Sequence, residues 1–199
     1  MADDKRGRDK QAHDAERRQR EREIREELSR SGEAEPPVEP AELAAVEEEL
    51  ASVTFPATAR TVVDAVGPRA LTAGEGHPTV SDLLPDTELE TFDSPRAVRA
   101  RIQRPTVARA MKRVVEAAEG RQQVELRESQ LDAFRKTFEA LEDIDADDED
   151  EGITVIRDWI IGRIQQKEKV PGSRGVRREA AKFCRSNGYP VRNDEWLGI

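Results

Sequence analysis

Cysteine, histidine, aromatic residues and long apolar runs are all scarce in this chain of 199 residues. Cys184 is the single cysteine, which excludes an internal disulfide and a metal site built from several cysteines. No apolar run approaches the roughly 18 residues that span a membrane, and the start, MADDKRGRDK, lacks the apolar stretch of a signal peptide. We therefore expect a cytoplasmic protein that does not engage a membrane.

Charge, by contrast, is abundant. Charged residues make up 38% of the chain, the formal net charge is -9, and 26 of the 33 basic residues are arginine. A carboxylate excess opposes self-association in concentrated salt, so the composition favours a halophilic archaeon as the source, although a GC-rich genome also raises arginine content. Hydrophobic residues amount to 36%, which is little for one large core.

The sequence predicts a mainly α protein in three parts. Residues 1–40 combine a charged arm with the acidic, Pro-rich linker EAEPPVEP, and we expect them to be flexible, largely disordered or solvated helix. Residues 41–120 form a small helical module. Residues 121–199 form a helical carboxy-terminal module with an acidic loop at 142–151.

Helix starts and stops are marked clearly. Thr58, Ser94 and Ser173 stand where N-cap residues belong, while Pro105 interrupts a helical pattern and Gly120 ends one. Three helices of the carboxy-terminal module have apolar residues at helical spacing. These lines are Leu131, Phe134, Phe138 and Leu141; Ile153, Ile156, Trp159, Ile160 and Ile164; and Val176, Ala180, Phe183 and Cys184.

The stretch FPAT, residues 55–58, and the later FDSPRAVRARI, residues 92–102, resemble a family of small acidic haloarchaeal proteins that is uncharacterised. The charged arm and the Pro-rich linker resemble it too, so the likeness covers about residues 1–104. It implies no activity and no catalytic residue, and residues 105–199 lie outside it.

Nothing in the chain indicates an enzyme, a cofactor or a small-molecule substrate. The two histidines, His13 and His77, have no nucleophile arranged beside them, and no phosphate-binding or hydrolase motif occurs. His77 precedes a proline in a Gly-rich loop and reads as a surface residue. Cys184 repeats with the apolar face of its helix, so we expect a buried thiol.

The acidic run EDIDADDEDE, residues 142–151, holds eight acids and no base. Counted from Asp147, a calcium loop would use Asp147, Glu149, Glu151 and Asp158 around Gly152. Glutamate is too long for the short coordinating positions, and an acidic loop before a helix explains the run without metal. We predict no metal site.

Two basic stretches stand out in the acidic chain. Residues 94–115 carry seven Arg or Lys and no acid, and residues 163–192 carry nine bases against two acids. Helices with one apolar and one basic face present charge to phosphates, so we predict a non-catalytic accessory or regulatory protein that binds DNA or RNA. The predicted binding residues are Arg109, Lys112, Arg113, Arg174, Arg177, Arg178, Lys182 and Arg185.

Two other interpretations stay open at this point. The basic faces could dock an acidic protein partner, which would make the chain an interaction or assembly adaptor. They could also be solvated, or could pair with the acidic runs at 33–49 and 142–151.

Overall fold

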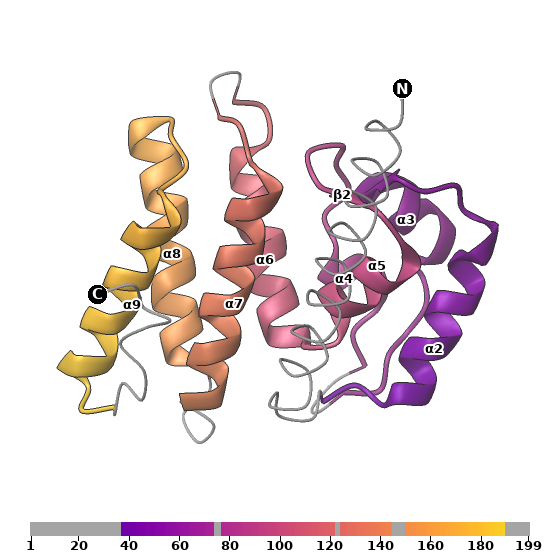
Figure 1. The fold of residues 1–199 in the computed structure, drawn as a ribbon, viewed down its shortest axis with the longest axis horizontal. Coiled ribbons are helices and arrows are strands. Elements are labelled where there is room, and N and C mark those ends of the chain that lie inside the picture. Colours follow the sequence, from indigo (N-terminus) through magenta and orange to yellow (C-terminus); the bar gives the residue numbers. More distant parts are fainter. Residues whose placement is uncertain (1–36, 74–76, 122–123, 145–149, 190–199) are drawn as a thin grey trace, which may run out of the picture. The chain divides into compact units, whose positions relative to one another are not determined.

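The computed structural model describes residues 37–73, 77–121, 124–144 and 150–189, and there it is mainly helical, as the sequence predicts (Figure 1). Most of the predicted arm and linker therefore lies outside the described residues. Among the residues that are described, no helix has both the length and the apolar character needed to cross a membrane.

Short helices form the amino-terminal part of the described chain. They are α2 (Pro40–Glu49), the 3-10 turn η1 (Leu50–Ser52), α3 (Ala59–Val66), α4 (Val80–Leu83) and α5 (Pro95–Ile102). The predicted caps are confirmed at α3 and α5, where Thr58 accepts the N–H of Thr61 and Ser94 accepts the N–H of Ala97. These hydrogen bonds satisfy N–H groups that have no partner within the helix.

Two short strands, which the sequence did not predict, bring the stretch FPAT (residues 55–58) next to the start of FDSPRAVRARI (residues 92–102). β1 (Ala57–Thr58) pairs antiparallel with β2 (Thr91–Phe92), with Ala57 opposite Phe92. Each strand leads directly toward a capped helix start, so the pair fixes where α3 and α5 begin. Strands of two residues are too short to show an alternating hydrophobic pattern, which is why sequence reasoning missed them.

Four longer helices follow: α6 (Pro105–Ala118), α7 (Glu128–Ile144), α8 (Glu151–Lys167) and α9 (Ser173–Ser186). Successive helices run in opposite directions, and α7, α8 and α9 lie side by side (Figure 1). Both α6 and α9 pack against α7 and α8. The break at Pro105 and the stop at Gly120, where φ is +75°, are as predicted. The predicted cap at Ser173 is wrong, because Gly172 is the N-cap and Ser173 is already helical.

Buried side chains form two hydrophobic clusters. One joins α2, α3, α4 and α5, and the other fills the four-helix bundle around Phe134 and Phe138, both fully buried. The clusters meet at the start of α6, where Ala108 belongs to the first and Val107 to the second. Helix α6 therefore packs mainly with the bundle. Both clusters lie in one compact unit, Pro36–Ile199, and the predicted module limits at residues 40 and 120 stay a prediction.

Candidate nucleic-acid interface

Two arginines of the first basic stretch are engaged between α5 and its neighbours. The side chain of Arg101 is only 5% exposed; its Nε donates to Oε1 of Glu90 at 2.8 Å and its Nη1 donates to the carbonyl oxygen of Ala108 at 3.1 Å. Arg99 forms an ion pair of 3.4 Å with Glu47 of α2. These guanidinium groups hold the fold together and are poorly placed to meet an external ligand.

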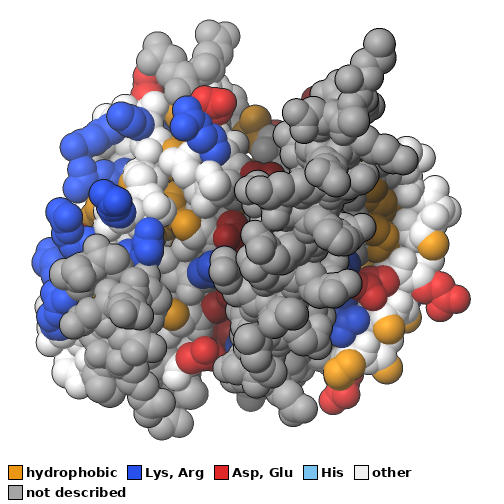
Figure 2. Space-filling view, viewed as in Figure 1, with side chains coloured by type: hydrophobic (Ala, Val, Ile, Leu, Met, Phe, Trp, Pro, Cys, Tyr) orange, Lys and Arg blue, Asp and Glu red, His pale blue; other side chains and the backbone are white. Residues whose placement is uncertain are grey.

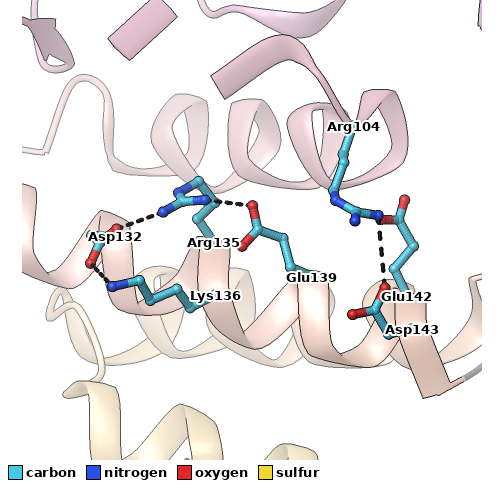
Figure 3. A network of polar contacts seen from close by, with 7 residues as sticks. All are labelled: Arg104, Asp132, Arg135, Lys136, Glu139, Glu142 and Asp143. Atoms are coloured by element: carbon cyan, nitrogen blue, oxygen red, sulfur yellow. Dashed lines mark hydrogen bonds and ion pairs between the residues drawn. The ribbon is translucent and has the colours of Figure 1, made fainter. Parts of the chain in front are cut away.

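Arg104 lies at the break between α5 and α6 and reaches α7 (Figure 3). Its Nη1 is 2.5 Å from Oε2 of Glu142 and 3.8 Å from Oδ1 of Asp143. Burial raises the pKa of the Glu142 carboxyl, and the hydrogen bond from Arg104 opposes that rise. The start of the acidic run at 142–151 thus pairs with the first basic stretch. This agrees with the interpretation in which basic residues pair with the acidic runs.

Helix α7 carries a second ionic network close to this one. Arg135 donates to Asp132 at 2.9 Å and to Glu139 at 2.5 Å, and Lys136 lies 3.0 Å from Asp132 (Figure 3). Burial opposes ionisation of Asp132, but the hydrogen bonds from Arg135 and Lys136 outweigh it and lower the pKa of that carboxyl. The cations of α7 are therefore paired within their own helix.

Of the predicted binding residues on α6, Arg109 and Arg113 are exposed and Lys112 is half-buried. The ammonium group of Lys112 donates to the carbonyl oxygen of Ser81 on α4 and lies 3.8 Å from Glu116. Helix α6 therefore offers two exposed arginines, while its lysine faces α4.

The second basic stretch has a different character. On α9, Arg174, Arg178, Lys182 and Arg185 are exposed, and Lys182 makes an ion pair of 3.2 Å with Glu179 of the same helix. Arg177 is half-buried, with its Nε 3.5 Å from the carbonyl oxygen of Ser173. We give the name α8–α9 surface to seven of the basic residues of α8, the turn after it and α9: Arg163, Lys167, Lys169, Arg174, Arg178, Lys182 and Arg185.

Lys and Arg side chains gather on the side of the molecule that α8 and α9 form, whereas Asp and Glu side chains are few there (Figure 2). On this surface the chain keeps in space the grouping of positive charge that it has in sequence. Grouped cations raise the local concentration of an anionic ligand more than scattered ones do.

A pocket of about 360 Å³, the Trp159 pocket, opens within the α8–α9 surface. Its wall includes four cations, one carboxylate and the two glycines of the first turn of α9. The guanidinium carbon of Arg163 lies 4.9 Å from the ring centre of Trp159, a cation–π contact. The lining residues are Trp159, Arg163, Lys167, Lys169, Val170, Pro171, Gly172, Gly175, Arg178 and Glu179.

The first turn of α9 adds backbone donors to this wall. A Cβ atom added to Gly172 would meet nothing within 4 Å, so the turn is open, and no side chain caps it. The N-terminus of a helix carries partial positive charge and N–H groups without helical partners, which suit phosphate oxygens. This turn and the cations around it line the same concavity, so its positive charge and its backbone N–H groups are suited to an anion.

The structure does not bring the two basic stretches together. Helices α6 and α9 each pack on α7 and α8, which separate them in the bundle. A ligand held by Arg174 and Arg178 would therefore not also contact Arg109 and Arg113. The α9 residues of the predicted set form one surface, and the α6 residues lie apart from it.

Sequence reasoning did not select the residues that line the pocket on α8. The sequence predicts Trp159 only as part of the apolar face of its helix. Arg163, Lys167 and Lys169 contribute to the second basic stretch but are not among the predicted binding residues. A signal was present, since Trp159 and Arg163 are four residues apart and so lie on one helical face. The approach of the first turn of α9 could not be read from spacing.

The remaining residues singled out in the sequence are the cysteine, the two histidines and the calcium pattern. Cys184 is buried, as predicted, and His77 is exposed in the loop before α4. Asp147 and Glu149 of the calcium pattern, like His13, lie outside the described residues. Gly152 is buried in the first turn of α8, where an added Cβ would come within 3.1 Å of the ring of Phe183 on α9. Within the described segments, no cluster of three or more His, Cys, Asp or Glu could hold a metal ion.

The fold and this surface define a helical protein with a basic face on the last two helices of a four-helix bundle. Residues 37–114 of the chain match a family of unknown function, DUF5789. No curated protein and no solved structure matches the chain. The match supports the resemblance to an uncharacterised family but runs from residue 37 to residue 114 rather than over 1–104. It includes the β1–β2 pair and stops within α6, so the α8–α9 surface lies outside it.

Proposed function

We propose that the protein is a non-catalytic nucleic-acid-binding protein and that the α8–α9 surface is its contact face. The observation that carries the proposal is the Trp159 pocket, in which four cations, an indole ring and an open helix N-terminus line one concavity. Proteins that bind nucleic acids combine cations for the phosphates with an aromatic ring or a guanidinium plane for the bases. An acidic protein partner would need the cations but not the ring.

The expected strength depends on salt. If the surface neutralises about five phosphates, the logarithm of the binding constant falls by about 4.5 for each tenfold rise in salt concentration. Between about 0.15 M and about 2 M salt the affinity then drops roughly 10⁵-fold. Binding in concentrated salt would rely on bidentate arginine contacts and on stacking at Trp159, which salt weakens less.

The environment of the chain belongs to the same proposal. A net charge of -9 with few lysines supports a halophilic setting, and we propose that the protein is cytoplasmic. In that setting most protein surfaces are acidic, so a basic face discriminates strongly between partners. The accessory or regulatory role stays part of the same proposal.

The test compares two triple variants with equal change of charge. One replaces Arg174, Arg178 and Arg185 with Glu, and the control replaces Arg96, Arg109 and Arg113 with Glu; all six arginines are exposed. Fluorescence anisotropy of labelled single-stranded DNA, duplex DNA and RNA is measured from 0.2 M to 2 M KCl, after circular dichroism has shown equal helix content.

The proposal predicts that the α9 variant binds about 100-fold more weakly near 0.2 M KCl, because about three phosphate contacts are lost. The control should stay within about threefold of the unaltered chain, since its arginines lie away from the α8–α9 surface. Equal losses in both variants would show that only net charge matters. Absence of binding to all three probes at 0.2 M KCl, with capture of an acidic protein instead, would replace this proposal with the adaptor role.

A further inference from the structure

The cations around the Trp159 pocket differ from those at the centre of the fold, because no carboxylate neutralises them. Four basic residues line the pocket: Arg163, Lys167, Lys169 and Arg178. Among the described residues none of the four makes an ion pair, whereas Arg104 and Arg135 each meet two carboxylates. Glu179, which also lines the pocket, is paired with Lys182 at 3.2 Å. The pocket therefore keeps an excess of positive charge.

The same pocket has an apolar side. Trp159, Val170 and Pro171 line it, and the guanidinium carbon of Arg163 lies 4.9 Å from the centre of the indole ring. Gly175 borders this ring, since a Cβ atom added there would lie 3.9 Å from Cη2 of Trp159. The volume of about 360 Å³ falls within the range of about 300–1,000 Å³ that is typical of pockets for small organic groups. Charge and a flat apolar surface thus meet in a space of suitable size for one nucleobase.

We propose that the protein binds single-stranded nucleic acid in preference to duplex, with one unpaired base held in the Trp159 pocket. This rests on the proposed nucleic-acid function and adds which form of nucleic acid the surface takes. The base lies against Trp159 and Arg163, because bases stack on aromatic rings and on guanidinium planes. Lys167, Lys169 and Arg178 meet the phosphates on either side of it.

A double helix offers no such base unless it is opened. Its bases are paired and stacked, and only their edges are exposed in the grooves. Turning one base out of the stack costs free energy, whereas a single strand already presents the faces of its bases. The cations alone would serve a duplex as well as a single strand, so the pocket is what distinguishes the two.

The first test compares the affinities of the full chain for three probes with about ten phosphates each, in about 0.2 M KCl. The probes are a thymidine oligonucleotide, the same sugar–phosphate backbone without bases, and a GC-rich hairpin duplex. Fluorescence anisotropy measures binding of each. Stacking of one base contributes about tenfold or more in affinity, so we expect the thymidine probe to bind at least about tenfold more tightly than either of the others.

The indole itself reports the contact. The chain has two tryptophans, and the second, Trp196, lies outside the described residues. Trp196→Phe leaves Trp159 as the single source of indole fluorescence. We expect the thymidine probe to quench this fluorescence and the abasic probe to change it little, because a base that stacks on an indole quenches it. Unchanged fluorescence with the thymidine probe bound would contradict the proposal.

A variant without change of charge separates the pocket from the cations around it. Gly175→Leu places a side chain beside Trp159 and in the pocket, and it removes no cation. Ser186→Leu, at an exposed position of α9 that does not line the pocket, is the matched control. We expect Gly175→Leu to weaken binding of the thymidine probe about tenfold and to leave binding of the abasic probe within about twofold. Ser186→Leu should leave both unchanged.

Three further results would overturn the proposal. They are equal affinity for the thymidine and abasic probes, equal affinity for the thymidine probe and the duplex, and retention of thymidine binding by Gly175→Leu. The first two need only the unaltered chain, so they decide the matter even if a variant folds poorly. In each case nucleic acid still binds, and the proposed function stands. Absence of binding to every probe is the separate result that would contradict the proposed function, and this inference with it.

Discussion

Replacing Arg104 with methionine removes a guanidinium group on which the packing of α6 against α7 depends. The side chain of Arg104 is 9% exposed, and its partner Glu142 is 18% exposed. Breaking a fully buried ion pair costs about 3–5 kcal/mol, because the remaining charge is left buried without a partner. Partial exposure of Glu142 and its ability to take up a proton reduce this, so we expect Arg104→Met to lower the free energy of unfolding by about 2–3 kcal/mol.

The matched control is Arg178→Met on the α8–α9 surface. It removes the same charge and the same kind of side chain, but Arg178 is exposed, and such substitutions usually change stability by no more than about 0.5 kcal/mol. Urea denaturation at pH 7, followed by circular dichroism, measures both. A double-mutant cycle with Glu142→Gln isolates the pairwise contribution.

At acidic pH, the difference in the free energy of unfolding between Arg104→Met and the unaltered chain should become smaller. Burial already raises the pKa of Glu142 above its usual 4.5, and loss of Arg104 removes the opposing hydrogen bond. A raised pKa in the folded state means that the destabilisation is largest at neutral pH and is relieved as pH falls through the folded pKa. A deficit that does not shrink on acidification, or an equal deficit in Arg178→Met, would refute this reasoning.

Three further substitutions test local features. Asp82→Asn weakens the reciprocal cap with Thr79 and should lower the free energy of unfolding by about 0.5–1 kcal/mol. Hydrogen bonds from Thr79 lower the pKa of Asp82, so this loss should fade in thermal melts as the pH drops below about 4. Gly120→Ala, at φ +75°, should cost about 1 kcal/mol in urea denaturation. Glu168→Gly should stabilise by about 0.5–1 kcal/mol, since Glu168 ends α8 at φ +48°; a loss would contradict the strain argument.

Local signals in the sequence were sufficient for much of the fold. Thr58 and Ser94 cap the helices they were predicted to cap, and Pro105 and Gly120 end helices where backbone chemistry requires it. Such features act over three or four residues, so they can be recognised without knowing what packs against them.

The fate of the first basic stretch could not be predicted in the same way. Its arginines find their partners far along the chain, as Arg104 does with Glu142, and no spacing rule connects such pairs. One sign was available, because Arg101 stands three residues after Val98 on the apolar face of α5 and so was placed to be buried. Counting charge along the chain overlooked which face each arginine occupies.

The Trp159 pocket depends on tertiary approach for the same reason. Charge on α9 was recognisable, whereas the indole and Arg163 belong to the preceding helix and meet the first turn of α9 only after the chain reverses. The basic residues of α9 therefore predict a charged surface, whereas the pocket in that surface depends on how α8 packs beside α9.

The most direct measurement of the central claim is the salt dependence of oligonucleotide binding by the unaltered chain and by the variant in which Arg174, Arg178 and Arg185 are replaced with Glu. Each phosphate contact adds about 0.7–0.9 to the slope of log binding constant against log salt concentration. If the α8–α9 surface holds the backbone, the slope of the variant is shallower by about 2–3. An unchanged slope would contradict the assignment of nucleic-acid contacts to α9.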